Sequence, residues 1–244
     1  MTEFDPERFP RKLNLGCGLD LRAGYLNVDL NAFNKPDLVG DVRDLPMLPN
    51  GKYEEINAQD VLEHLPRTAT ASALREWNRL LRMGGTLVLR VPSLEGLAEL
   101  FRKNRSFNKQ RELMQCLFGT QAYTGDFHMT SFTRLLLEGY LERTGFKLVR
   151  IDMMDGWLFN VAAKKVAQVG PSLDSQRASL LKIANDSDFV FEAYELLLRR
   201  KPDSGGQGFF LGSLMEGQLT REQVLCIIEG SPEFRDLHAD DPDV

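Results

Sequence analysis

The sequence predicts an α/β protein: a seven-stranded, mostly parallel sheet with helices, followed by a small all-α domain. Residues 10–165 alternate short apolar runs with glycine turns and helical stripes, which is typical of parallel strands joined by helices. Residues 169–172, Val-Gly-Pro-Ser, interrupt that pattern, and the segments after them have helical periodicity. We therefore expect one domain over residues 1–168 and a second over residues 173–244.

A glycine turn follows the first expected strand. Residues 12–18 read Lys-Leu-Asn-Leu-Gly-Cys-Gly, and residues 25–29 read Tyr-Leu-Asn-Val-Asp, a second strand ending in a lone carboxylate. Such a turn lets backbone approach a nucleotide-like ligand, and an acid ending the next strand can accept hydrogen bonds from both ribose hydroxyls. The turn and Asp29 therefore predict a nucleoside cofactor. Because Leu21 replaces the third glycine of the dinucleotide fingerprint and Asp29 comes early, NAD is disfavoured.

Later segments complete the expected sheet. Residues 37–46 predict a short third strand and a loop, and residues 54–66 predict a fourth strand followed by Val-Leu-Glu-His-Leu-Pro. Apolar spacing over residues 70–82 predicts a helix that Gly84-Gly85 ends before a strand over 86–91. A last helix, capped by Ser131 and closed by Gly145, is expected before strands over 146–151 and 157–162.

In this order, the segments resemble those of Rossmann-like S-adenosylmethionine-dependent methyltransferases, particularly small-molecule enzymes whose first strand reads Leu-Asn-Leu-Gly-Cys-Gly. The resemblance spans residues 10 to about 165 and implies the Rossmann-like fold with S-adenosyl-L-methionine as cofactor. Asp29 would hold the ribose, Asp41 would accept from the adenine amino group, and the Val42 amide would face a ring nitrogen. The other cofactor-binding candidates are Asn14, Gly16, Cys17, Gly18, Leu30 and Gln59. Asn14 and Asp20 depart from the pattern, since many relatives have an acid and a third glycine there.

Methyl transfer from a sulfonium requires alignment of acceptor, methyl and sulfur, and a hydroxyl acceptor must also lose a proton. His64 and His128 are the candidate catalytic bases, because the pKa of imidazole lies near working pH. Asp126 is expected to orient His128, and Glu63 is a further candidate, whereas His64 could instead pack or cap a helix. No metal site is expected, because no His-x-x-His or paired carboxylate spacing occurs.

Residues 92–127 form an insertion after the fifth strand, where this fold usually places acceptor-binding elements. Arg102 and Arg105 lie there among other bases, and either they hold an anionic acceptor or they belong to a solvated helix face. The preferred reaction is O-methylation of a sugar, polysaccharide or nucleotide-linked sugar, which would place the protein in polysaccharide biosynthesis. The alternatives are C- or N-methylation of another small molecule and a nonenzymatic nucleoside-binding scaffold.

Composition favours a soluble cytoplasmic protein. The opening residues lack the basic and apolar regions of a signal peptide, and no apolar run could span a membrane. Three distant cysteines suggest neither disulfides nor structural zinc. The net charge is −5, and residues 171–244 hold 7 basic against 14 acidic side chains. Nucleic acid is not an expected partner, because this acidity repels it and no Asp-Pro-Pro-Tyr or Asn-Pro-Pro-Tyr segment occurs.

The segment after the boundary is expected to be helical over residues 173–184, 188–198, 207–216 and 220–229. Its motifs over residues 185–236 resemble a small helical domain of unknown function related to phycobilisome linkers, whose bacterial copies often accompany secreted proteins or glycan-modifying enzymes. We expect a docking or oligomerisation module without a catalytic part, with His238 in a frayed terminus.

Overall fold

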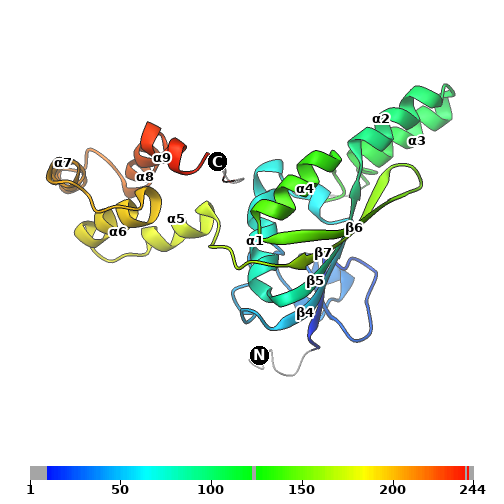
Figure 1. Ribbon diagram of the computed structural model, residues 1–244, viewed down its shortest axis with the longest axis horizontal. Helices are drawn as coiled ribbons and strands as arrows, with labels where there is room; N and C mark the ends of the chain where they lie inside the picture. Colours follow the sequence, from blue (N-terminus) through cyan, green and yellow to red (C-terminus); the bar gives the residue numbers. More distant parts are fainter. Residues whose placement is uncertain (1–9, 123–124, 240, 242–244) are drawn as a thin grey trace. The chain divides into compact units, whose positions relative to one another are not determined.

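A computed structural model describes residues 10–122, 125–239 and 241, and the chain divides into two compact units, one ending at Gly170 and one beginning at Pro171 (Figure 1). The amino-terminal unit holds a seven-stranded sheet in the order β3-β2-β1-β4-β5-β7-β6. The strands are β1 (Lys12–Leu15), β2 (Leu26–Asp29), β3 (Leu38–Val39), β4 (Tyr53–Gln59), β5 (Leu81–Pro92), β6 (Phe146–Met154) and β7 (Leu158–Lys165). Only β7 runs antiparallel to its neighbours, which confirms the predicted mostly parallel sheet.

The strand order reverses at β1, which pairs with β2 on one side and with β4 on the other. In an open parallel sheet, ligands bind outside the carboxyl ends of the strands at such a reversal. The loops after β1, β2 and β4 all begin at this edge. The glycine turn and the Glu63-His64 segment lie in these loops, and Asp29 is the last residue of β2.

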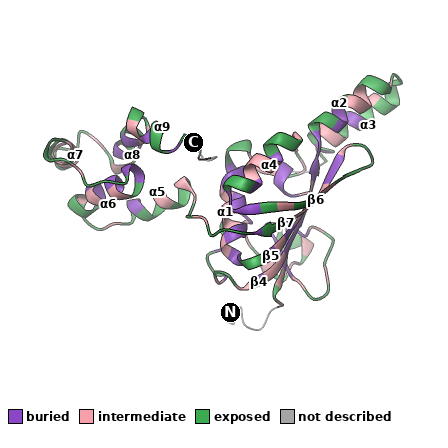
Figure 2. Cartoon of the chain, in the orientation of Figure 1, coloured by how far each residue is buried: buried purple, intermediate pink, exposed green. Residues whose placement is uncertain are grey.

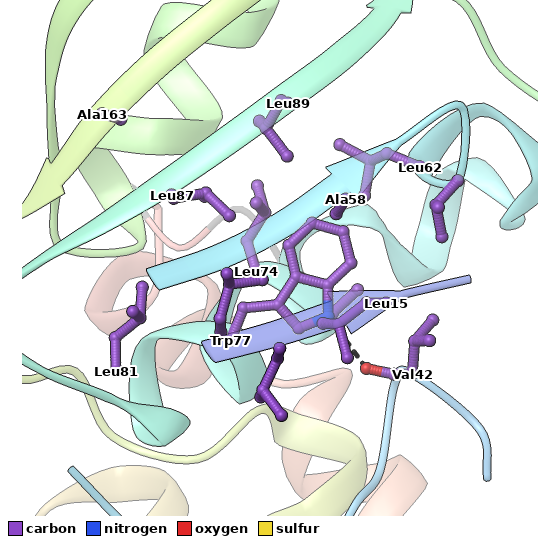
Figure 3. Packing of buried hydrophobic residues seen from close by; sticks show 14 of the residues in the cluster. Leu15, Val42, Ala58, Leu62, Leu74, Trp77, Leu81, Leu87, Leu89 and Ala163 are labelled. Atoms are coloured by element: carbon purple, nitrogen blue, oxygen red, sulfur yellow. Dashed lines mark hydrogen bonds between the residues drawn. The ribbon is translucent and has the colours of Figure 1, made fainter. Parts of the chain in front are cut away.

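Two helices pack on the apolar face of the sheet, α1 (Thr70–Leu80) and α4 (Arg134–Arg143). Trp77 of α1 is fully buried and lies close to Leu15 and Leu74 (Figure 3). Leu87 and Leu89 of β5 belong to the same core. Buried residues are concentrated in the sheet and in α1, whereas the hairpin of α2 (Leu94–Lys103) and α3 (Phe107–Phe118) is largely exposed (Figure 2).

The opposite face of the central strands is polar. Asn14 of β1 is in register with Asn27 of β2 and Asn57 of β4, so the three amides share one face. Asn57 Nδ2 donates to Asn14 Oδ1 at 2.8 Å, and Asn14 Nδ2 donates to Asn27 Oδ1 at 3.0 Å. A parallel sheet buried on both faces has continuous apolar strands, whereas these strands alternate. The described connection between β1 and β2, residues 16–25, contains no helix that could cover this face, which agrees with the alternation.

Two predicted boundaries were wrong. Helix α1 ends at Leu80, and β5 begins at Leu81, so Gly84-Gly85 lies inside the strand range. The β4–β5 register shifts between Tyr53 and Glu55, and this irregularity accommodates Gly84 at φ 73°. Helix α4 is capped by Thr133, whose side chain accepts from the Leu136 amide at 3.2 Å. The predicted cap, Ser131, instead donates to the Pro92 carbonyl.

The carboxy-terminal unit consists of α5 (Leu173–Leu181), α6 (Asp186–Leu198), α7 (Ser204–Met215), α8 (Arg221–Glu229) and α9 (Pro232–Leu237). Its core is formed around Phe189, Ala193 and Leu197. The placement of His238 in a frayed end was wrong, because the side chain is buried. Its Nε2 lies 2.9 Å from the Leu197 carbonyl, and its ring stacks on Phe234. Among the described residues, no helix is long and apolar enough to cross a membrane.

Candidate active site

The glycine turn after β1 has two residues in the left-handed region, Gly16 at φ 59° and Gly18 at φ 50°. A Cβ on Gly16 would lie 2.5 Å from Cγ2 of Val61, so this glycine lets the turn pack against the loop after β4. A Cβ on Gly18 would meet no atom within 4 Å. The turn is therefore closed against the protein at Gly16 and open to an approaching ligand at Gly18.

Asp29 is buried at the end of β2 and holds the turn in place. One carboxylate oxygen accepts from the Gly18 amide at 2.7 Å, and the other accepts from the Asn31 amide at 2.8 Å and from Asn34 Nδ2 at 3.2 Å. A carboxylate offers about four acceptor positions, so a cofactor hydroxyl still has a place to donate. Burial, and secondarily Asp29, raises the pKa of the neighbouring Cys17 thiol to about 11, which keeps it protonated at neutral pH.

The other candidate cofactor-binding residues near the turn differ in whether their polar atoms are already hydrogen-bonded within the protein. Both Nδ2 protons of Asn14 are used within the protein, by the Asp20 carbonyl at 2.7 Å and by Asn27, so Asn14 positions the turn. Gln59 Oε1, at the end of β4, accepts from Arg22 at 2.9 Å. Leu30 is exposed directly after Asp29, where it could cover a bound nucleoside.

The loop after β3 carries the predicted adenine contacts. The Asp41 carboxylate accepts from Arg43 through its backbone amide at 2.9 Å and through Nη2 at 2.6 Å, and these bonds hold the pKa of Asp41 below its usual value. An adenine amino group would therefore share Asp41 with Arg43. Val42 is buried, and its carbonyl accepts from Trp77 Nε1 at 2.9 Å, which anchors this loop to α1 (Figure 3).

Hydrogen bonds join the segment after β4 to the loop before α4. The Glu63 carbonyl accepts from the Met129 amide at 2.7 Å and from the Thr130 amide at 3.2 Å, and His64 Nδ1 lies 3.1 Å from the Phe127 carbonyl. As a result, the rings of His64 and His128 meet edge to face with centroids 4.9 Å apart. The two predicted bases, far apart in sequence, therefore lie side by side.

Backbone carbonyls set the proton positions on both rings. His128 Nδ1 lies 3.1 Å from the Cys116 carbonyl, just as His64 Nδ1 faces the Phe127 carbonyl. Because a carbonyl can only accept, each Nδ1 carries the proton and each neutral ring keeps a lone pair on Nε2. Asp126, the expected orienting group, accepts instead from Thr120 and from the Ala122 amide within its own loop.

Glu63 completes this group, which we call the Glu63–His64–His128 cluster. One ligand atom from each of the three residues lies within 4.8 Å of the others. The Glu63 side chain is buried, and its Oε2 has no hydrogen-bond partner among the described residues. Burial raises the pKa of Glu63 to about 8, and burial together with nearby His64 lowers the pKa of His128. At neutral pH, a neutral Glu63 thus lies beside an unprotonated imidazole.

Comparison with protein families finds one match in each unit. Residues 8–89 match the family described as methyltransferase domain, a region that contains the glycine turn, Asp29, Asp41 and Glu63. This match accompanies the turn and carboxylate at the point where the strand order reverses. The match supports an S-adenosylmethionine-dependent methyltransferase domain that includes residues 8–89. Residues 177–238 match a domain of unknown function, DUF4214, and the resemblance to phycobilisome linkers stays a prediction.

Solved structures similar to the methyltransferase domain are distant. A possible exported protein of Bordetella parapertussis is 16% identical, with 65% of this chain and 63% of that chain covered and a TM-score of 0.48. A methyltransferase of Methanosarcina mazei is 17% identical, with coverages of 64% and 92% and a TM-score of 0.48. The 1,6-didemethyltoxoflavin N1-methyltransferase of Burkholderia thailandensis is 16% identical, with coverages of 64% and 71% and a TM-score of 0.44. This chain thus spans less than two thirds of the Bordetella protein. No curated protein matches the sequence significantly.

The predicted acceptor arginines are separated from the cluster in the methyltransferase domain. Arg102 lies in the last turn of α2 and pairs with Glu99 of the same helix at 2.8 Å, and Arg105 is exposed in the turn between α2 and α3. His128 is instead held at the other end of α3, at Cys116. The intervening helix is roughly 18 Å long at 1.5 Å per residue. A small acceptor bound at the cluster therefore does not reach the turn of the hairpin.

Proposed function

We propose that the protein transfers a methyl group to a hydroxyl of a sugar, polysaccharide or nucleotide-linked sugar, and that the hydroxyl is bound and deprotonated at the Glu63–His64–His128 cluster. The observation that carries the proposal is the pair of adjacent imidazoles, each with its Nδ1 atom at a backbone carbonyl. The cluster is also connected to the cofactor turn. Gly16 of the turn packs against Val61, and Val61 precedes Glu63 by two residues.

The chemistry requires this combination of groups. The acceptor oxygen attacks the methyl carbon, the carbon–sulfur bond breaks, and its electron pair returns to sulfur. The products are a methyl ether, S-adenosylhomocysteine and one proton. A sugar hydroxyl is a weak nucleophile until it gives up that proton, so a proton acceptor must lie beside the transferred methyl group. Neutral imidazole provides one near physiological pH.

A glycan acceptor is supported by the α2–α3 hairpin. Arg102 in the last turn of α2 and Arg105 in the exposed turn after it lie at one end of α3, a helix roughly 18 Å long whose other end holds His128. An extended acceptor could place one hydroxyl at the cluster and an anionic group at this turn. The resemblance of the carboxy-terminal unit to a family that accompanies glycan-modifying enzymes agrees with this acceptor class.

The test is acceptor-dependent release of S-adenosylhomocysteine by the full chain. Uronic-acid polysaccharides, phosphorylated sugars and nucleotide-linked sugars would be offered separately, and the methylated atom would be located by NMR. A matched control acceptor would already carry methyl groups on its hydroxyls. We expect release with a free hydroxyl and none with the blocked control. A methyl group found on nitrogen or carbon would rule out the proposal.

We propose that the carboxy-terminal unit is a docking or oligomerisation module without a catalytic part, and that the protein acts in the cytoplasm. The separate core of this unit supports the proposal. A chain ending at Gly170 should bind S-adenosylmethionine in calorimetry as tightly as the full chain does. Weaker cofactor binding by the shortened chain would show that the second unit serves the pocket.

A further inference from the structure

We propose that Glu63, His64 and His128 bind one divalent transition-metal ion, with Zn²⁺ as the reference ion. Their ligand atoms lie within 4.8 Å of one another. The ligands come from two segments that backbone hydrogen bonds join, so their proximity is fixed by the fold. The sequence shows no metal-binding spacing because His64 and His128 meet only in three dimensions.

Both histidines are prepared as ligands. Metal-binding histidines usually donate their second ring N–H to a carbonyl or carboxylate, which fixes the tautomer and the ring orientation. The Cys116 and Phe127 carbonyls receive these bonds here, each at 3.1 Å. The Nε2 atoms are then free to bind an ion without a change of tautomer.

Glu63 supplies an independent observation. Its side chain is almost fully buried, and Oε2 has no hydrogen-bond partner among the described residues. A buried polar atom without a partner is costly, and a cation would satisfy Glu63 by displacing the carboxyl proton on binding. Asp60 is not a ready fourth ligand, because both of its oxygens accept from Arg90 Nε, at 2.8 and 3.0 Å.

The distances require a small closure on binding. Zn–N bonds of about 2.0–2.1 Å in a tetrahedral site place ligand atoms about 3.4 Å apart. Ligand atoms as much as 4.8 Å apart must therefore approach by up to about 1.4 Å, and the His64 side chain is only half-buried. Three protein ligands leave a coordination position open, as in catalytic rather than structural zinc sites.

The donor set selects the class of ion. Two imidazoles and one carboxylate suit Zn²⁺ and its first-row neighbours, whereas Mg²⁺ and Ca²⁺ prefer oxygen ligands throughout. With an ion bound, the two Nε2 atoms would be ligands and no longer bases. The open position would instead let the ion lower the pKa of a bound acceptor hydroxyl, whose proton would pass to water. This catalytic role rests on the proposed function, but ion binding itself does not.

The test is calorimetric titration of ZnCl₂ into tag-free, chelator-treated full chain near neutral pH. We expect one ion per chain, a rise in melting temperature with zinc, and no comparable binding of Mg²⁺. Glu63→Gln and His64→Gln should each weaken zinc binding at least tenfold. His238→Gln is the matched control, because it removes the remaining histidine of the chain, in the other unit, and should leave the affinity unchanged.

Each result decides the matter. Absence of zinc binding by the wild type, equal binding of Mg²⁺, or unchanged affinity in His64→Gln would overturn the inference. If buried Glu63→Gln fails to fold, the half-buried His64→Gln still decides. S-adenosylhomocysteine binding would be measured on the same samples. If S-adenosylhomocysteine binds but zinc does not, only the metal site is refuted. If zinc binds but no methyl transfer is found, the proposed reaction is refuted and the metal site stands.

Discussion

The indole N–H of Trp77 donates a hydrogen bond to the Val42 carbonyl at 2.9 Å, across the core between α1 and the loop that carries the predicted adenine contacts (Figure 3). Trp77 is fully buried, and Val42 is nearly so. The bond therefore links the packing of the apolar face to the position of the cofactor loop.

Trp77→Phe should lower the free energy of unfolding by about 1–3 kcal/mol, because it leaves a cavity and a buried carbonyl without its donor. Cofactor affinity should fall as well, since the loop loses its anchor. Urea unfolding and calorimetry with S-adenosylhomocysteine would measure the two effects. Trp157→Phe, at the half-buried second tryptophan, is the control. Equal losses in both variants would contradict a specific role for the Trp77–Val42 bond.

Gly16→Ala should destabilise the domain more than Gly18→Ala. Both residues have positive φ, but only Gly16 would bring a Cβ against Val61. Backbone strain costs on the order of 1 kcal/mol in each variant, and the clash adds to it in Gly16→Ala. Thermal melting would measure the difference, and Val61→Ala in the Gly16→Ala background should restore part of it. Equal melting temperatures for the two single variants would count against this packing.

Asp29→Asn should weaken S-adenosylmethionine binding at least tenfold. The substitution keeps the size of the side chain but replaces one accepting oxygen with a donor, which disrupts the bond from Gly18 or the contact with ribose. Calorimetry would measure the affinity. Asp152→Asn on edge strand β6 is the matched control and should bind normally. Unchanged affinity in Asp29→Asn would remove this carboxylate from the cofactor site.

Glu63 should make the stability of metal-free protein fall as pH rises. Burial raises its pKa from 4.5 to about 8 in the folded chain, so its contribution is complete below pH 4.5 and is lost as the pH rises through about 8. Within this window the slope can reach about 1.4 kcal/mol per pH unit. Urea unfolding of wild type and Glu63→Gln from pH 5 to 8 would isolate the effect. Parallel pH profiles would contradict it, and Glu142→Gln, at an exposed acid, should retain the wild-type slope.

Arg102→Ala combined with Arg105→Ala should raise the KM for an extended anionic acceptor and leave cofactor affinity intact. The effect should be absent for a small acceptor, which does not reach from the cluster to the turn between α2 and α3. Steady-state kinetics with short and long acceptors would measure this dependence. The control is Lys147→Ala with Arg150→Ala on β6, which removes the same charge elsewhere and should leave the KM unchanged. Unchanged kinetics with every acceptor would assign the arginines to a solvated helix face.

Local chemistry in the sequence determined the sheet, the methyltransferase fold and the cofactor. Leu-Asn-Leu-Gly-Cys-Gly predicts a strand and a turn because only glycine adopts the left-handed conformation freely, and Asp29 follows at the end of the next strand. The sequence determined the ends of helices and strands less closely. Gly84-Gly85 became part of β5 because pairing with β4 decided where the strand begins, which a single segment does not reveal.

Only the tertiary structure decided how the functional side chains combine. It placed Arg102 and Arg105 away from His128, because an α-helix lies between them. It gave His128 a backbone carbonyl as its orienting partner in place of Asp126. It also brought Glu63, His64 and His128 together through hydrogen bonds between segments distant in the chain. Sequence patterns record local preferences of the backbone, whereas the grouping of these side chains depends on long-range contacts that form when the sheet and its loops pack.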